Sequence, residues 1–123
     1  MCQPEKNPQR GDIWLVNLPY TNTSVQAMTR PVIIVSNNIG NCRSTICLVV
    51  PMTTKDKPAM PTHVQFMYNG KVNTALCEQV LTVSSEQLLY KVGSINTETT
   101  AALNTALEVS LALKESSNDR KTL

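Results

Sequence analysis

Apolar positions along residues 12–95 come in short blocks, and this pattern predicts a mainly β protein. The first block, DIWLVNL at residues 12–18, alternates between two faces of a strand and ends at Pro19. The blocks at 31–36 and 45–52 are almost wholly apolar and rich in β-branched residues. Such runs are typical of strands that are buried on both faces.

Polar segments connect these blocks. Residues 20–29 form a polar loop that is long for a hairpin, and long ordered loops are often functional. Residues 37–43, which contain Gly40-Asn41, predict a turn. We expect a fourth strand at 61–66, followed by a type I′ hairpin turn at Asn69-Gly70.

Weaker signals follow in the second half of the chain. A strand, or a bent pair of strands, is expected over about residues 73–83. Ser84 or Ser85 would then cap a short helical turn that runs through Leu89. A last short strand is expected at 90–95.

The C-terminal part of the sequence predicts one helix. Asn96 or Thr97 would cap it, and leucines recur every four residues at Leu103, Leu107 and Leu111. Several short strands followed by one amphipathic helix predict a small β-barrel, or a strongly bent sheet, covered by that helix.

The length of 123 residues fits one domain with one core. We expect a flexible arm at 1–10, a single domain at 11–114 and a flexible tail at 115–123. Neither a signal peptide nor a run of ~18 apolar residues is visible, which predicts a cytoplasmic protein without a membrane span.

Only four cysteines and one histidine are available as sulfur or nitrogen ligands for a metal ion. Cys2, Cys42, Cys47 and Cys77 form no C-x-x-C pair, and His63 is the only histidine, so a metal site is not expected. Reduced, buried thiols are the better interpretation. His63 is expected to be a structural hydrogen-bonding group.

The clearest chemical candidate is a cation at the start of a strand. Pro31 pushes Arg30 into an extended conformation, at the end of a polar loop and the lip of a rigid strand. Arg30 could meet an anion there or form an ordinary surface salt bridge. The net charge of +2 is too small to indicate a nucleic-acid-binding protein, although a local basic groove is compatible with it.

Several short segments, taken in order, give the chain a specific resemblance. It resembles the MazF/PemK (Kid) family of toxin endoribonucleases over about Arg10 to Leu113. The segments are GDIWLV (11–16), TRPVIIV (29–35), NIGN (38–41), VVPMT (49–53) with PTHV (61–64), EQV (78–80) and ALEVSLAL (106–113).

This resemblance implies a small SH3-like barrel, the MazF/Kid/CcdB-like toxin fold, assembled as a homodimer. It implies sequence-specific cleavage of single-stranded RNA, including mRNA, without metal or other cofactor, and inhibition by a co-expressed antitoxin. The family's arginine before proline falls on Arg30, and its hydroxyl at the end of the third strand falls on Thr53, next to Thr54. Its glutamine falls on Gln79 and its loop serine on Ser24.

Two departures from the family pattern keep an alternative open. The loop from Ser24 through Gln26 to Thr29 has no acidic residue and no glycine, and Leu81 stands where the family often has arginine. The alternative is a non-catalytic toxin on the same barrel, either one that resembles a DNA gyrase inhibitor or one that binds only RNA or antitoxin.

Metal-free RNA cleavage requires an in-line attack by the 2′-hydroxyl on the adjacent phosphorus. Arg30 would stabilise the phosphoryl charge first and protonate the leaving group second, and Thr53 would add a hydroxyl donor. The general base is not identified: Glu78 is a candidate, but it could equally pair with a lysine. The further candidates for RNA binding or support are Tyr20, Ser24, Gln26, Thr54, Lys55, Lys57 and Gln79. The expected inhibitor is an acidic, partly disordered antitoxin segment in the same groove.

Overall fold

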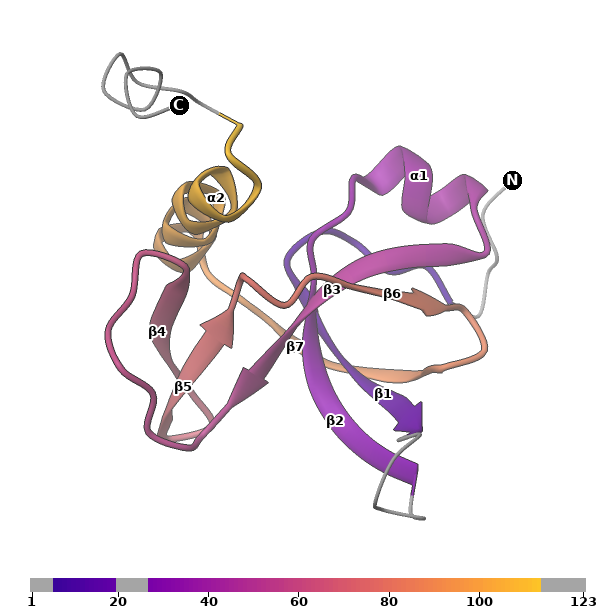
Figure 1. Ribbon diagram of the computed structural model, residues 1–123. Helices are drawn as coiled ribbons and strands as arrows, with labels where there is room; N and C mark the ends of the chain where they lie inside the picture. Colours follow the sequence, from indigo (N-terminus) through magenta and orange to yellow (C-terminus); the bar gives the residue numbers. More distant parts are fainter. Residues whose placement is uncertain (1–5, 20–26, 114–123) are drawn as a thin grey trace.

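The computed structural model of the chain describes residues 6–19 and 27–113 (Figure 1). Seven strands and two helices follow one another in these residues, with the second helix at the C-terminal end. The strands are β1 (Asp12–Pro19), β2 (Ala27–Ile34), β3 (Ile46–Thr53), β4 (His63–Tyr68), β5 (Lys71–Leu76), β6 (Leu81–Ser84) and β7 (Leu88–Ser94), and the helices are α1 (Asn38–Arg43) and α2 (Thr97–Leu111). The prediction of a mainly β domain with a C-terminal helix is confirmed.

Strand β3 is the element that joins the two halves of the sheet. The strands are arranged in the order β4-β5-β3-β2-β1-β7, all neighbours are antiparallel, and β6 pairs with the first half of β3. The last two residues of β3, Met52 and Thr53, pair with β5 instead. Because β3 changes partners along its length, the sheet bends around it into a partly open barrel (Figure 1).

Two apolar clusters fill the barrel, one on each face of the sheet formed by β1, β2 and β3. Ile13, Ile33 and Val50 face β4, β5 and helix α2. Their sequence neighbours Trp14 and Val32 face β6 and β7 on the opposite side. Burial on both faces explains why the sequence blocks of β2 and β3 are almost uninterrupted by polar residues.

Strands β4 and β7 are the two edges of the sheet, and a side chain connects them. The Tyr68 hydroxyl donates a hydrogen bond of 2.9 Å to the Val92 carbonyl. A Cβ atom on Gly93 would lie only 2.9 Å from the Tyr68 ring, so glycine is what allows the close approach. The barrel is therefore closed here by packing and one hydrogen bond.

Several local predictions are confirmed. Asn69 and Gly70 both have positive φ angles, 57° and 75°, as a type I′ turn requires. The predicted bent pair over residues 73–83 corresponds to β5 and β6. Asn96 caps α2 by accepting a hydrogen bond of 2.8 Å from the Thr99 N–H.

Two predicted turns are wrong. Residues 37–43 contain helix α1, because the Asn37 side chain caps it by accepting from the Gly40 N–H and the Asn41 side chain donates to the Ser36 carbonyl. Such polar contacts leave no apolar period in the sequence. The predicted helical turn after Ser84 is a tight turn between β6 and β7, in which the Gln87 side chain accepts from the Ser84 N–H.

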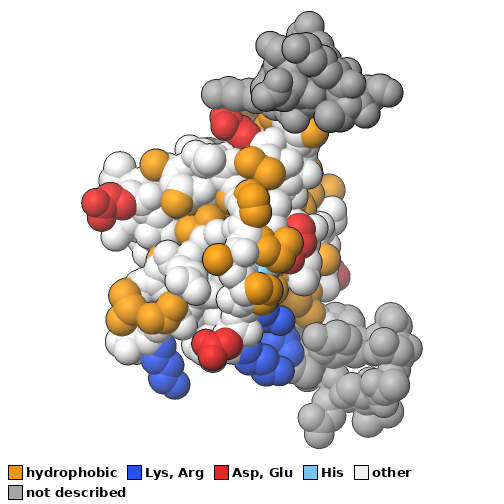
Figure 2. Space-filling view, turned by 60° about the vertical axis from the view of Figure 1, so that its left-hand side comes forward, with side chains coloured by type: hydrophobic (Ala, Val, Ile, Leu, Met, Phe, Trp, Pro, Cys, Tyr) orange, Lys and Arg blue, Asp and Glu red, His pale blue; other side chains and the backbone are white. Residues whose placement is uncertain are grey.

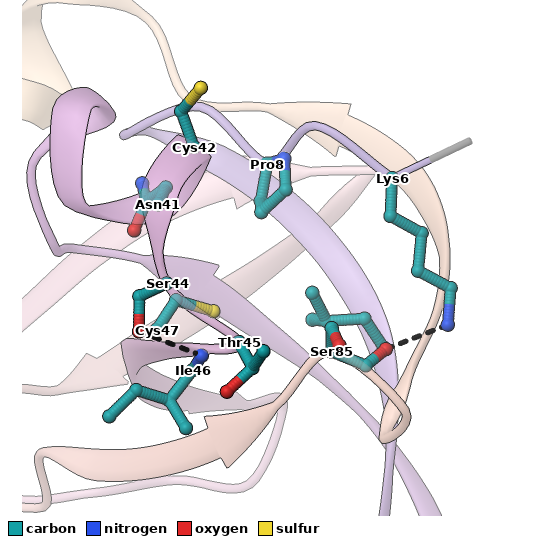
Figure 3. A pocket seen from close by; sticks show the side chains of 10 residues that line it. Lys6, Pro8, Asn41, Cys42, Ser44, Thr45, Ile46, Cys47 and Ser85 are labelled. Carbon is teal, nitrogen blue, oxygen red and sulfur yellow. Dashed lines mark hydrogen bonds between the residues drawn. The ribbon is translucent and has the colours of Figure 1, made fainter. Parts of the chain in front are cut away.

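The segment before β1 contacts the barrel. The Lys6 ammonium donates to the Ser85 carbonyl over 2.7 Å, and Pro8 is buried. Figure 3 shows both residues at a cavity beside α1 and the start of β3. Residues 6–10, predicted as part of a flexible arm, thus pack on the sheet. The cavity, about 20 Å³, has room for one water molecule but not for a nucleotide.

The cysteines differ in state. Cys47 and Cys77 are buried free thiols, and burial raises the pKa of each to about 11, with the Glu78 charge adding to the shift at Cys77. The expectation of a reduced thiol is wrong for Cys42, which is disulfide-bonded. None of the helices in the described part of the chain has the length and apolar character to cross a bilayer.

Candidate active site

An open groove of about 250 Å³ lies at the end of the barrel where β1, β2 and β3 meet the segment after β5. It collects side chains that are far apart in the sequence. The described residues that line it are Leu18, Arg30, Pro51, Met52, Thr53, Lys55, Lys57, Leu76, Gln79 and Leu81. Five strands (β1, β2, β3, β5 and β6), the loop after β3 and the turn after β5 therefore contribute to a single concave surface.

Arg30 lies inside strand β2, not at its lip as predicted. The strand begins at Ala27 because its ladder with β1 continues to the pair Pro19–Ala27, and Arg30 pairs with Val16. Side chains alternate along a strand, so Arg30 shares a face with Val32 and Ile34. Those two are fully buried under β6 and β7, whereas Arg30 lies beyond this cover, where the face opens into the groove.

The Arg30 guanidinium has an unused donor. Its Nε atom is buried, yet it makes no hydrogen bond to any residue that the structure describes. A buried charged donor without a partner is costly, typically by about 1–3 kcal/mol or more. A bound anion would remove this cost, because guanidinium matches phosphate oxygens with two parallel N–H donors.

Thr53 brings a hydroxyl to the same groove. It is the last residue of β3, two positions after Pro51, so the two side chains point to the same face. Its Oγ1 accepts a hydrogen bond of 3.1 Å from the Lys55 N–H. This bond uses the oxygen as an acceptor and leaves the hydroxyl proton free to donate into the groove.

Both cationic and apolar side chains line the groove. Lys55 and Lys57 are exposed on the loop between β3 and β4. Lys and Arg side chains gather along the lower edge of the face in Figure 2, which brings the β4 and β5 side of the molecule forward. The apolar wall includes Leu18, Leu76 and Leu81. A nucleotide is complementary to this lining, because it combines an anionic phosphate with an apolar base face.

The groove brings together five of the predicted site residues, namely Arg30, Thr53, Lys55, Lys57 and Gln79. Thr54 and Glu78 are not among its lining residues, and Tyr20, Ser24 and Gln26 lie outside the described residues. Leu18, Pro51, Met52 and Leu76 also line the groove but were not predicted as site residues. The alternation of β1, which puts Leu18 on the face of Val16 and Trp14, was the available signal for Leu18.

Glu78 pairs with histidine, not with a lysine. Its Oε2 lies 3.0 Å from His63 Nε2, and its Oε1 accepts from the Thr62 hydroxyl over 3.1 Å. Burial raises the pKa of the Glu78 carboxyl, but the hydrogen bonds from His63 and Thr62 outweigh this effect and hold the pKa below its ordinary value. A carboxylate held in this way is a poor proton acceptor. The geometry therefore gives Glu78 a structural partner.

A second open groove has different chemistry. It measures about 370 Å³ and lies between α2, the end of β2 and β3. Its wall is mostly apolar and includes Leu107 and Leu111, with Arg10 and Glu108 at its margin. In the described part of the chain, no three His, Cys, Asp or Glu side chains lie close enough together to hold a metal ion.

Comparisons with known proteins agree on one family. The model of the PemK-like, MazF-like toxins of type II toxin-antitoxin systems matches residues 9–111. Endoribonuclease EndoA of Bacillus subtilis (strain 168) is 32% identical over 110 residues, which cover 85% of this chain and 95% of that protein. Endoribonuclease MazF of Staphylococcus saprophyticus is 31% identical over 110 residues, which cover 85% of this chain and 92% of that protein.

Solved structures show the same fold. A mycobacterial endoribonuclease in complex with its cognate antitoxin superposes with a TM-score of 0.75 at 24% identity, over 89% of this chain and 99% of that chain. A MazE-MazF structure from Deinococcus radiodurans also gives a TM-score of 0.75, at 16% identity, over 89% of this chain and 99% of that chain.

Proposed function

The chain belongs to the PemK-like, MazF-like family of toxin endoribonucleases, and we propose that the groove around Arg30 and Thr53 is where it cleaves single-stranded RNA. The observation that carries this proposal is the buried Arg30 Nε, which has no partner among the described residues and lies at a groove with a free hydroxyl proton on Thr53. Both donors suit a phosphoryl group whose negative charge grows during reaction.

The proposed reaction is an internal transfer that needs no bound water. The 2′-oxygen forms a bond to phosphorus as the bond from phosphorus to the 5′-oxygen breaks, which leaves a 2′,3′-cyclic phosphate and a 5′-hydroxyl. The 2′-hydroxyl loses its proton to a base, and the departing 5′-oxygen gains one. Arg30 and Thr53 donate hydrogen bonds to the nonbridging phosphoryl oxygens, where they lower the barrier by preorganised electrostatics.

The other lining residues would hold the RNA. Lys55 and Lys57 attract the phosphate backbone, and the apolar wall offers a surface on which a base can lie. Gln79 can hydrogen-bond a base edge or the phosphate and so brace the bound strand. Leu81, 37% exposed where the family often has arginine, adds apolar surface to this wall instead of a cation.

Cleavage is expected to persist when divalent metals are removed. None of the described lining residues is a carboxylate, so the groove offers no hard ligands for Mg²⁺. The test incubates purified protein and a long RNA of mixed sequence in excess EDTA, then maps the new ends. We expect cuts at a short recurring sequence, with cyclic phosphate and 5′-hydroxyl ends. A strict requirement for magnesium, or 5′-phosphate ends, would contradict the proposed chemistry, and binding without cleavage would favour the non-catalytic alternative.

We propose two protein partners as well. The first is an acidic antitoxin segment that occupies the groove, where Arg30, Lys55 and Lys57 would pair with its carboxylates in place of phosphates. The second is another copy of this chain. Leu48, Leu111 and Leu113 border the second groove and are 39%, 52% and 66% exposed, so a dimer contact there would bury them. An RNA substrate makes the cytoplasm the expected site of action.

These partners can be tested together. An acidic antitoxin peptide is titrated against a labelled, uncleavable RNA at two salt concentrations, and the free protein is sedimented at micromolar concentration. We expect RNA and peptide to exclude each other, the affinity of each for the protein to fall as salt rises, and the free protein to be a dimer. Simultaneous binding of RNA and peptide without mutual weakening would contradict groove competition, and a strict monomer would contradict the dimer.

A further inference from the structure

Two chain segments that carry groove residues are joined by one histidine. The loop between β3 and β4 carries Lys55 and Lys57, and the turn after β5 carries Gln79. Between them, His63 Nδ1 lies 2.8 Å from the Pro58 carbonyl of the loop, and Nε2 lies 3.0 Å from the Glu78 carboxylate of the turn. The His63 side chain is only 5% exposed, and His63 is not among the residues that line the groove.

Both ring nitrogens face oxygen atoms that can only accept hydrogen bonds. A neutral imidazole has one N–H and one lone pair, so it could satisfy one of these oxygens and would direct the lone pair at the other. The imidazolium carries two N–H groups and satisfies both. The arrangement therefore calls for a charged ring, with Thr62 completing the shell around Glu78.

We propose that His63 is a positioning residue, which ties the loop of Lys55 and Lys57 to the turn of Gln79 and so sets the spacing across the groove. The backbone supports the same connection, because the Cys77 N–H donates to the Thr62 carbonyl and the His63 N–H donates to the Met60 carbonyl. This inference rests on the proposed function for its effect on RNA. The His63 tie, which is the pair of contacts from the ring to the Pro58 carbonyl and to the Glu78 carboxylate, does not depend on that function.

The charges around the ring give the tie a pH dependence. Burial lowers the pKa of His63, but the hydrogen bonds to Glu78 and to the Pro58 carbonyl outweigh burial and raise the pKa above its ordinary value, while the Lys57 charge opposes them. The folded-state pKa thus lies above the unfolded value of 6.5. The tie is complete below that value and is lost as the pH rises through the folded-state pKa. RNA binding should weaken over the same pH range.

Two substitutions each remove one of the two contacts of the His63 ring and keep the other. In His63→Asn the amide nitrogen can replace Nδ1 and keep the bond to Pro58, whereas in His63→Gln it can replace Nε2 and keep the bond to Glu78. We expect each to raise KM roughly tenfold, as for loss of one charge-assisted hydrogen bond, with kcat nearly unchanged. Neither variant should retain the weakening of RNA binding as the pH rises through the His63 titration.

A matched control separates positioning from stability. Tyr68→Phe also deletes one hydrogen bond, that to the Val92 carbonyl between the sheet edges, and its site is not part of the groove. We expect it to lower the melting temperature while KM and the pH profile stay at wild-type values. Wild-type KM and pH profiles in both His63 variants would overturn the inference.

The wild-type protein gives a readout that needs neither RNA nor a variant. NMR titration should show a His63 midpoint above pH 6.5, with the Lys57 and Gln79 amide signals moving at the same midpoint. If either amide signal does not shift during the titration, the ring does not connect the two segments and the inference fails. If the amides respond but the protein leaves RNA intact, the proposed function fails and the tie stands.

Discussion

Replacing Arg30 with alanine is expected to lower the rate of RNA cleavage by about 10²–10³-fold, the usual effect of removing one preorganised donor from a developing oxyanion. The fold should survive, because the side chain lies beyond the covered core and its buried Nε makes no hydrogen bond with the described residues. Steady-state cleavage of a defined RNA and a thermal melt measure the two effects separately.

Arg30→Lys should fail almost as completely as alanine. Lysine keeps the positive charge but cannot reproduce the planar fork of two parallel donors. Arg43→Ala is the matched control, because it removes the same charge from the exposed end of α1, away from the groove lining. Full activity in Arg30→Lys would show that charge alone suffices, and near-wild-type activity in Arg30→Ala would overturn the mechanism.

Removing the Thr53 hydroxyl is expected to cost roughly 10²-fold in kcat. Valine has nearly the same shape as threonine but no hydroxyl, so Thr53→Val loses the donor, and with it the acceptor of the exposed Lys55 N–H, while the strand end keeps its packing. Thr53→Ser keeps the hydroxyl and should stay within a few-fold of wild type. Kinetics on the same RNA give the comparison.

The neighbouring threonine provides the control for Thr53. Thr54 is exposed and is not among the lining residues of the groove, so Thr54→Val should leave kcat within about twofold of wild type. Equal losses from both substitutions would mean that the loop conformation, and not the Thr53 hydroxyl, is what the reaction needs.

The sheet was predictable where its signal is local. Blocks of β-branched residues such as those of β2 and β3 identify strands, and Asn69-Gly70 identifies a hairpin, since each depends on nearby backbone conformation. Helix α1 was not predictable from periodicity, because polar contacts of Asn37 and Asn41 stabilise it in place of an apolar face. Strand order also has no local signal.

The groove shows the same limit. Arg30 and Thr53 were predicted from their place in family-like motifs, but their position on one face follows from the register of the strands. Val32 pairs with both Trp14 and Pro51, so these three residues share a face of the sheet. Arg30 lies two residues before Val32 and Thr53 two residues after Pro51, so both point to that same face. No sequence pattern could show that β6 and β7 leave this end of the face uncovered. The pairing of His63 with Glu78 likewise joins residues that only the β4–β5 hairpin brings together.

The most direct test of the central claim observes the Arg30 Nε–H itself. An RNA containing the mapped cut sequence, with a 2′-deoxy sugar at the cleaved nucleotide, binds without reacting because the attacking hydroxyl is missing. We expect the ¹⁵N–¹H signal of Arg30 Nε to move downfield on titration, with the same Kd as RNA binding followed by fluorescence, and this shift to be absent for a DNA hairpin of unrelated sequence. An Arg30 signal that stays in place while the RNA saturates the protein would show that the phosphate binds elsewhere, and would contradict the assignment of this groove as the site of cleavage.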